Sequence, residues 1–181
     1  SEMVCAFWGQ TELCLGATIV ADMGTGKTIG GIKIVNQIDG IKNVLIVSAR
    51  KKITGDIKGG NIWEKELEKF GSHHNITTMT VGQAMKIPIV DLIEIDFVIL
   101  DEIHELLTPK RVEFVESLNN NCIKFLALTG TPDDENDFKK KAYAKHCPII
   151  YRYMDSEVDG VINKTKVLVY NHYLGDNEYV I

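Results

Sequence analysis

The sequence predicts an α/β domain whose sheet is mostly parallel and carries helices on both faces. Short runs of Val, Ile, Leu, Ala and Phe recur along the chain and are nearly continuous, as in strands buried on both faces. Segments with apolar residues at helical spacing lie between these runs, and such alternation is typical of a parallel sheet. The chain has 181 residues, of which 45% are hydrophobic, so it can bury the core of one domain.

Five segments are predicted to be strands before the pattern of the chain changes near its C-terminus. Four are the apolar runs and the fifth is β-branched, and both compositions favour strands. These segments are 17–20, 44–47, 76–80, 97–100 and 125–128.

Four segments between the strands are predicted to be helices. In one of them Trp63, Leu67 and Phe70 follow helical spacing, and another begins with acids and ends with bases, as the helix dipole favours. These segments are 27–37, 62–70, 110–120 and 134–146.

The pattern changes after Pro148, where strand-like segments replace the strand–helix alternation. They lie at 149–154 and 165–174, and a Gly-Asp-Asn turn is predicted at 175–177. We therefore expect a lobe over residues 1–150 and a C-terminal extension over residues 151–181.

The segment Ala21–Thr28, "ADMGTGKT", has the pattern of a phosphate-binding loop, although Ala stands at its first glycine position. A buried strand precedes it and a helix follows, which is the context that such a loop requires. Gly24 and Gly26 allow backbone N–H groups to turn toward phosphates, and Lys27 and the helix N-terminus add positive charge. The Thr28 hydroxyl is a Mg²⁺ ligand of the expected type. The residues expected around the nucleotide are Met23, Gly24, Thr25, Gly26, Lys27 and Thr28.

An acidic pair, Asp101 and Glu102, follows the apolar run 97–100. The carboxyl ends of parallel strands are where such sheets bind ligands, so the pair is expected beside the phosphate loop. Asp101 is predicted to hold Mg²⁺, and Glu102 to orient and deprotonate the attacking water. ATP and Mg²⁺ are therefore the expected cofactors, with Lys27 and Glu102 as catalytic residues.

The next apolar run ends in "TGTP", which places the hydroxyls of Thr129 and Thr131 at another strand end. They are predicted to lie near the terminal phosphate. On its own, this segment would be better explained as an ordinary exit from a strand, closed by Gly130 and Pro132.

Taken in order, "ADMGTGKT", "DEIH" and "TGTP" resemble the first three motifs of the superfamily-two helicases and translocases, of the DEAD/DEAH-like kind. The resemblance covers about residues 10–135, and Ala is frequent at the first loop position in that family. It implies a RecA-like ATPase lobe that moves on nucleic acid. By the same resemblance His104 couples the ATP site to the two threonines, and Gln10 recognises adenine.

The resemblance also implies nucleic-acid contacts after the second predicted strand, with DNA favoured over RNA. The sequence departs here from the family's Pro-Thr-Arg, and a solvated basic turn is an equal alternative. A following segment, "NIWEKELEKF", is similar to one in chromatin-remodelling-type translocases. The residues expected at the nucleic acid are Ser48, Ala49, Arg50, Lys51 and Thr80.

Two other classes compete with a motor lobe. One is a small P-loop kinase or GTPase, although "NKTK" lacks the Asp of a guanine-reading motif and the three arginines are not clustered. The other is a nucleotide-dependent interaction module. The resemblance implies that a second RecA-like lobe, missing from this chain, supplies arginines for hydrolysis, so we expect the isolated chain to be weakly active or inactive.

Composition limits the possible settings of this site. A net charge of −5 excludes binding of nucleic acid through bulk charge, so any such site is local. No apolar run approaches the roughly 20 residues that cross a bilayer, so no membrane partner is expected. The four cysteines lack metal-site spacing and are expected to be free thiols in a reducing, cytoplasmic environment.

Overall fold

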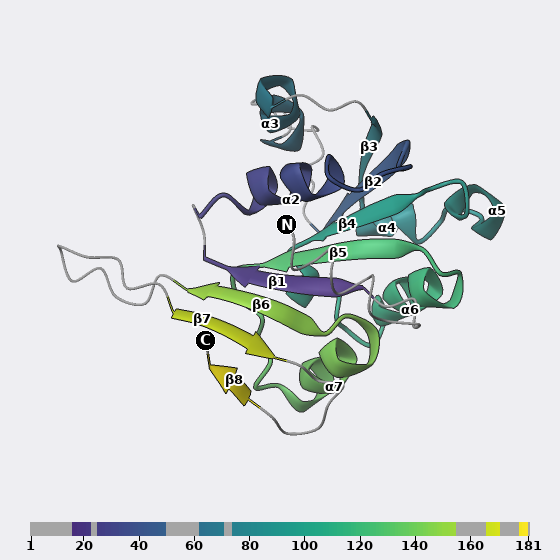
Figure 1. Cartoon of the computed structure of the whole chain (residues 1–181). Coiled ribbons are helices and arrows are strands. Elements are labelled where there is room, and N and C mark those ends of the chain that lie inside the picture. The colour runs from purple at the N-terminus through teal and green to yellow at the C-terminus, as the bar shows by residue number, and fades with distance from the viewer. Residues whose placement is uncertain are drawn as a thin grey trace.

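A computed structural model of the chain describes residues 16–22, 25–49, 62–70, 74–154, 166–170 and 178–180. Within these residues the strands form one sheet of eight, in the order β3-β2-β4-β5-β1-β6-β7-β8 (Figure 1). All pairings among β1 to β6 are parallel, whereas β7 and β8 are added antiparallel at one edge. The predicted α/β fold with a mostly parallel sheet is therefore confirmed.

The five strands expected in the first part of the chain all occur, each within one or two residues of its predicted bounds. The boundary expected at residue 150 falls inside β6, which pairs with β1. The turn expected at 175–177 lies outside the described residues. The strands are β1 (Ala17–Ala21), β2 (Asn43–Ser48), β3 (Asn75–Thr80), β4 (Phe97–Asp101), β5 (Lys124–Thr129), β6 (Ile149–Met154), β7 (Lys166–Tyr170) and β8 (Glu178–Val180).

The four predicted helices also occur, although three are shorter than expected. α7 begins after Asn136 rather than at residue 134, because the Asn136 side chain accepts from the backbone N–H groups of Phe138 and Lys139. Short helices α4 and α5 and the 3₁₀ turn η2 were not predicted. The helices are α2 (Lys27–Val35), α3 (Ile62–Phe70), α4 (Val81–Ala84), α5 (Ile89–Leu92), η2 (Ile103–Glu105), α6 (Val112–Asn120) and α7 (Asp137–His146).

The sheet separates two apolar cores because side chains alternate along its buried strands. In β2, Val44 and Ile46 pack toward α2 and α3, whereas Leu45 and Val47 pack toward the helices that follow β3, β4 and β5. Figure 1 shows α2 and α3 together on one side of the sheet. Both faces are thus covered, which explains why the strands read as continuous apolar runs.

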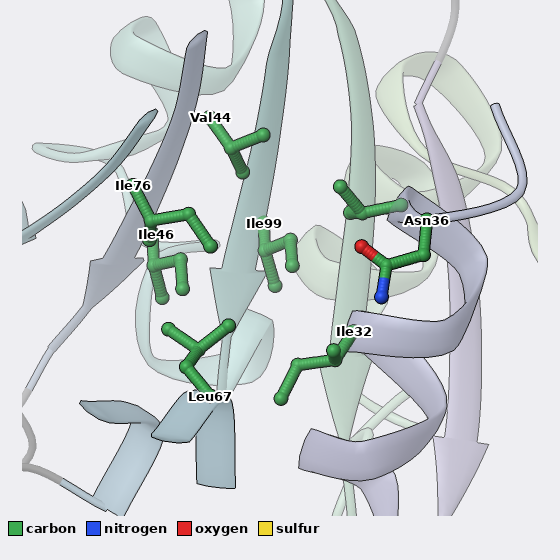
Figure 2. Close-up of a pocket in the computed structure, with 8 residues that line it drawn as sticks. Ile32, Asn36, Val44, Ile46, Leu67, Ile76 and Ile99 are labelled. Carbon is green, nitrogen blue, oxygen red and sulfur yellow. The ribbon is translucent and has the colours of Figure 1, made fainter. Parts of the chain in front are cut away.

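A small gap remains in the core beneath α2 and α3 (Figure 2). Its lining is apolar apart from one amide, so it is a space between packed side chains and does not suit a charged ligand. The lining residues are Ile32, Val35, Asn36, Val44, Ile46, Leu67, Ile76 and Ile99.

The C-terminus of α6 offers a prediction about stability. Cys122 has a left-handed φ of 54°, and its N–H donates to Asn119 while that of Ile123 donates to Leu118. This pattern is a Schellman motif, whose left-handed position favours glycine. We expect Cys122→Gly to raise the free energy of unfolding by about 1 kcal/mol, measured by urea denaturation. Cys122→Ala removes the thiol and keeps the strain, so an equal gain from Cys122→Ala would contradict this explanation.

Candidate functional site

The predicted site residues at the strand ends share one edge of the sheet. The register pairs Thr80 with Ser48, Ser48 with Asp101, and Val20 with Thr129. β5 lies between β1 and β4, so Thr129 lies between the start of the phosphate loop and the acidic pair. The parallel sheet therefore brings together residues that lie far apart in the sequence.

At the last position of the loop before α2, the backbone has a conformation that only glycine adopts readily. Gly26 has a φ of 86°, and a Cβ there would meet no atom within 4 Å. No side chain caps α2, so its N-terminal N–H groups keep their capacity for an anion. Met23 and Gly24, which were expected to complete the loop, lie outside the described residues.

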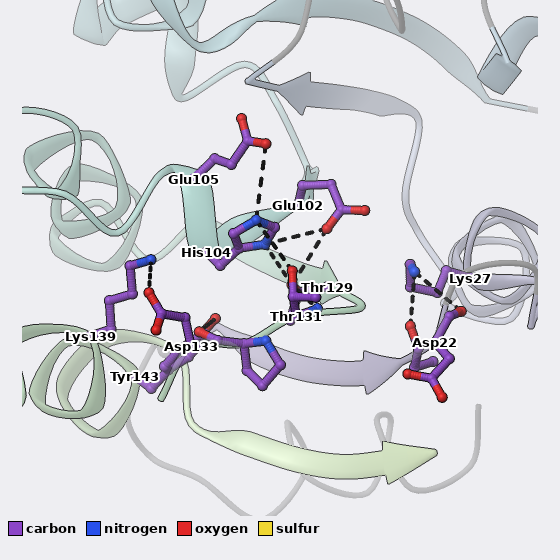
Figure 3. A network of polar contacts seen from close by, with 12 residues as sticks. Asp22, Lys27, Glu102, His104, Glu105, Thr129, Thr131, Asp133, Lys139 and Tyr143 are labelled. Carbon is purple, nitrogen blue, oxygen red and sulfur yellow. Dashed lines mark hydrogen bonds and ion pairs between the residues drawn. The ribbon is translucent and has the colours of Figure 1, made fainter. Parts of the chain in front are cut away.

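The Lys27 side chain folds back over the loop. Its Nζ donates to the carbonyl oxygens of Ala21 at 2.8 Å and Asp22 at 3.3 Å. The Thr25 hydroxyl donates to the Asp22 carbonyl oxygen as well, at 2.6 Å, which fixes the turn. Figure 3 shows Lys27 beside Asp22. Thr28 lies in the first turn of α2 and is partly exposed. The amine is thus held at the loop by neutral acceptors, which a phosphate would outcompete through its charge.

The charge of Lys27 acts on both carboxylates of the acidic pair. Burial raises the pKa of Asp101 above its ordinary value, and a hydrogen bond from Trp63 and the Lys27 charge oppose that rise. A hydrogen bond with His104 lowers the pKa of Glu102 against the effect of burial, and Lys27 lowers it further. The loop lysine therefore acts electrostatically on both acids.

Trp63 is a site residue that the sequence did not reveal. It was predicted as part of the apolar face of a helix and of a segment similar to one in chromatin-remodelling-type translocases, with no role at the site, and its side chain is indeed buried. Its Nε1 donates to Asp101 Oδ2 at 3.1 Å. No local pattern indicates a contact between residues 38 positions apart, so only the folded sheet shows it.

Glu102 adopts a left-handed backbone, with φ 53° and ψ 54°, directly after the last residue of β4. Such a conformation costs a non-glycine residue about 1–2 kcal/mol and is concentrated at functional positions. It ends the strand and begins η2, so that the side chain of Glu102 reaches the end of β5 rather than continuing the alternation of the strand.

A polar network connects η2 with the end of β5 (Figure 3). His104 Nδ1 lies 2.8 Å from Thr129 Oγ1 and 3.4 Å from Glu102 Oε2, and Nε2 lies 3.5 Å from Thr131 Oγ1. The Thr129 hydroxyl donates to Glu102 at 3.5 Å, and the Thr131 N–H donates to that hydroxyl at 3.2 Å. A tautomer with hydrogen on Nδ1 satisfies this arrangement, in which Thr129 bridges the imidazole and the carboxylate.

Contacts with α7 hold the exit of the "TGTP" segment. The Tyr143 hydroxyl donates to the Pro132 carbonyl at 3.1 Å, and Lys139 Nζ forms an ion pair with Asp133 at 2.6 Å (Figure 3). Asp133 itself has a left-handed φ of 50°. Thr131 therefore belongs to a segment fixed at both ends, by the polar network and by α7.

The residues expected to meet nucleic acid are less clearly placed. Ser48 is buried, and the hydroxyl of the partly exposed Thr80 caps α4 in a capping box with Gln83. Ala49 is partly exposed beside them. The remaining expected contacts, Arg50, Lys51 and the adenine-reading Gln10, lie outside the described residues.

The side chains fit a magnesium nucleotide better than a metal held by protein alone. Among the described residues no group of three or more His, Cys, Asp or Glu side chains could hold an ion. Mg²⁺ is usually bound through one or two protein ligands, with phosphates and waters completing its shell, and Thr28 and Asp101 are ligands of that type. No helix in the described part of the chain is long and apolar enough to span a membrane.

Comparisons with solved structures agree with the fold described above. The chain is similar to the SWI2/SNF2 ATPase core of Sulfolobus solfataricus in complex with dsDNA, with a TM-score of 0.57 and 20% identity over 78% of this chain. It is also similar to the UvsW helicase of bacteriophage T4, with a TM-score of 0.50 and 12% identity over 76% of this chain. No family model and no curated protein matches the sequence.

The matched regions form only part of those two proteins. The chain spans 32% of the length of the first and 54% of the length of the second. At these identities the comparisons establish the fold, and the resemblance read from three short motifs therefore extends to the tertiary structure. The chain has a RecA-like α/β fold, similar to that of the SWI2/SNF2 ATPase core and of the helicase in these comparisons.

Proposed function

We propose that this chain is the ATP-binding lobe of a nucleic-acid helicase or translocase. One observation carries the proposal: Lys27 and the pair Asp101 and Glu102 lie at the carboxyl edge of a parallel sheet, where the lysine charge acts on both carboxylates. The similarity of the fold to a SWI2/SNF2 ATPase core and to a phage helicase supports the same function.

In the proposed site, the N-terminus of α2 and Lys27 bind the nucleotide phosphates. Thr28 and Asp101 would hold Mg²⁺, which would supply positive charge beside the phosphates. Glu102 is ionised because its pKa is lowered, and it orients the attacking water and accepts its proton.

The network of His104, Thr129 and Thr131 gives the site a means of responding to the nucleotide. Thr129 contacts both His104 and Glu102, so a change at Glu102 alters the hydrogen bonding of the whole network. Thr131 then passes this change to the segment that α7 holds. This arrangement supports coupling between ATP hydrolysis and movement.

The proposed partners are DNA and a second RecA-like lobe. The Sulfolobus protein binds dsDNA, which favours DNA over RNA for this chain. Ala49, with Arg50 and Lys51 after it, is the proposed contact to phosphates. A second lobe would supply arginines, and such residues raise phosphoryl-transfer rates by about 10³–10⁵-fold.

A binding experiment tests the nucleotide site. We expect the wild-type chain to bind ATP in the presence of Mg²⁺, and Lys27→Ala to weaken binding by about 10–100-fold, since a charged hydrogen bond contributes about 1.5–3 kcal/mol. Isothermal titration calorimetry measures both dissociation constants.

Lys33→Ala is a matched control for this experiment. Lys33 is exposed in the last turn of α2, so its loss removes the same charge from the same helix away from the loop. Wild-type affinity is expected for Lys33→Ala. Absence of ATP binding by the wild type, or equal weakening by both substitutions, would reject the proposed site.

A further inference from the structure

The contact between Trp63 and Asp101 joins a helix to the metal-binding strand end. Trp63 belongs to α3, Asp101 ends β4, and the indole Nε1 donates to Oδ2 at 3.1 Å. The Trp63 side chain is 1% exposed and Asp101 is 9% exposed, so little water competes for this hydrogen bond. A buried tryptophan N–H requires an acceptor, and here the acceptor is a residue of the proposed site.

The chemistry of the indole suits a role in orienting the carboxylate. The Nε1–H group donates and cannot bind a metal, so Trp63 does not compete with Asp101 for Mg²⁺. A carboxylate has about four lone-pair positions, and accepting one N–H leaves lone pairs for a metal. A donor of this kind restricts rotation of the carboxylate, as partners of metal ligands generally do.

The indole is itself fixed by α2, the helix that follows the phosphate loop. A Cβ at Gly31 would lie 3.1 Å from Trp63 Cη2 and 3.4 Å from Leu128 Cδ1, closer than ordinary packing allows at the first of these atoms. The neighbouring Gly30 faces open space. The absence of a side chain at Gly31 thus makes room for the indole, and one helix carries both the loop lysine and the support of Trp63.

We propose that Trp63 is a positioning residue that orients the Asp101 carboxylate for Mg²⁺ and joins α2 and α3 to the metal site. This inference rests on the proposed nucleotide site and adds a residue to it. Because Trp63 belongs to α3, a shift of α3 would change the orientation of Asp101 through this hydrogen bond. In the sequence, α3 follows the segment proposed to contact DNA. The affinity for Mg²⁺ would then depend on the position of that helix.

The test separates Mg²⁺ from nucleotide binding. Calorimetry gives one ATP dissociation constant in EDTA and another at saturating Mg²⁺. The first divided by the second measures how much Mg²⁺ strengthens ATP binding. Trp63→Phe keeps an aromatic ring and removes the donor. We expect this ratio to fall by about tenfold or more, because losing the partner of a metal ligand costs about 10–100-fold in metal affinity. ATP binding with EDTA is expected to stay within about twofold of wild type.

Leu67→Ala is the matched control for packing. Leu67 lies on the same helix, is partly buried in the core and has no hydrogen-bonding side-chain group, so its loss loosens α3 and leaves the donor and the acceptor of the Trp63–Asp101 hydrogen bond in place. If Trp63→Phe does not fold, the benzothiophene analogue of tryptophan at position 63 keeps the bicyclic shape without the N–H. Gly31→Ala, which presses on the indole, is expected to reduce the ratio, whereas Gly30→Ala is not.

The outcomes distinguish the two proposals. A wild-type chain that binds no ATP would overturn the proposed function and this inference with it. Normal binding by the wild type, with an unchanged ratio in Trp63→Phe or its analogue, would overturn the inference alone. An equal fall in Leu67→Ala would also overturn it, since packing of α3 would then explain the effect.

Discussion

Glu102→Gln is expected to slow ATP hydrolysis by about 10²–10⁴-fold and to leave Mg-ATP binding nearly unchanged. The amide retains the size of the side chain and its contact with Thr129, but it cannot accept a proton from water. General bases contribute a factor of this size. The measurement is phosphate release in single turnover with DNA present, in a chain that carries both lobes if one lobe alone turns over too slowly. Unchanged turnover would remove Glu102 as the base.

Glu102→Gly is an informative companion because it separates catalysis from stability. Glycine adopts the left-handed backbone of this position without strain, so this variant should gain about 1 kcal/mol in the free energy of unfolding. Its turnover should nevertheless be lost, as in Glu102→Gln. A variant that is more stable but inactive would indicate that the strained backbone at position 102 is retained because turnover needs the carboxylate. If wild-type turnover is absent with DNA and a second lobe, a nucleotide-dependent interaction module becomes the better reading.

The sheet and the acidic pair were predictable because their signals are local. Parallel strands buried on both faces require continuous apolar runs, and a strand end fixes the edge on which Asp101 and Glu102 lie. Helix ends were predicted less well, since α7 begins at the residue whose side chain caps it, Asn136, rather than at the first acid. The helix α4 has only four residues, which is too short to show a helical period of apolar residues. Thr80 and Gln83 nevertheless form a capping-box pattern in the sequence.

What the sequence could not indicate are contacts made across the sheet. Trp63 meets Asp101, 38 positions away, because α3 packs against the end of β4. Such contacts depend on which strands are neighbours, and no local sequence pattern predicts the order β2-β4-β5-β1. Thr80, at another strand end, was predicted to contact nucleic acid, and that stays a prediction; in the structure its hydroxyl caps α4.

Gly16→Ala is expected to destabilise the protein by about 1–3 kcal/mol or more, the cost of adding atoms to a filled core. A Cβ at Gly16 would lie 2.0 Å from Cε2 and 2.1 Å from Cζ of Phe125, whose ring is fully buried and cannot swing into solvent. Urea denaturation measures the change in the free energy of unfolding. Gly82→Ala is the control, because a Cβ there meets nothing within 4 Å, and it should be neutral or slightly stabilising.

A second substitution shows whether the loss comes from this one contact. Phe125→Leu removes the ring atoms nearest to Gly16, so it should destabilise the wild type and yet recover part of the loss in Gly16→Ala, with a coupling of about 0.5–3 kcal/mol. Additive losses would place the cause elsewhere. Gly16 lies just before β1 and Phe125 lies in β5, and the pairing of these strands sets Val20 beside Thr129. Gly16 packs at the start of the strand pair that has this register, so we expect Gly16→Ala to weaken ATP binding as well as stability.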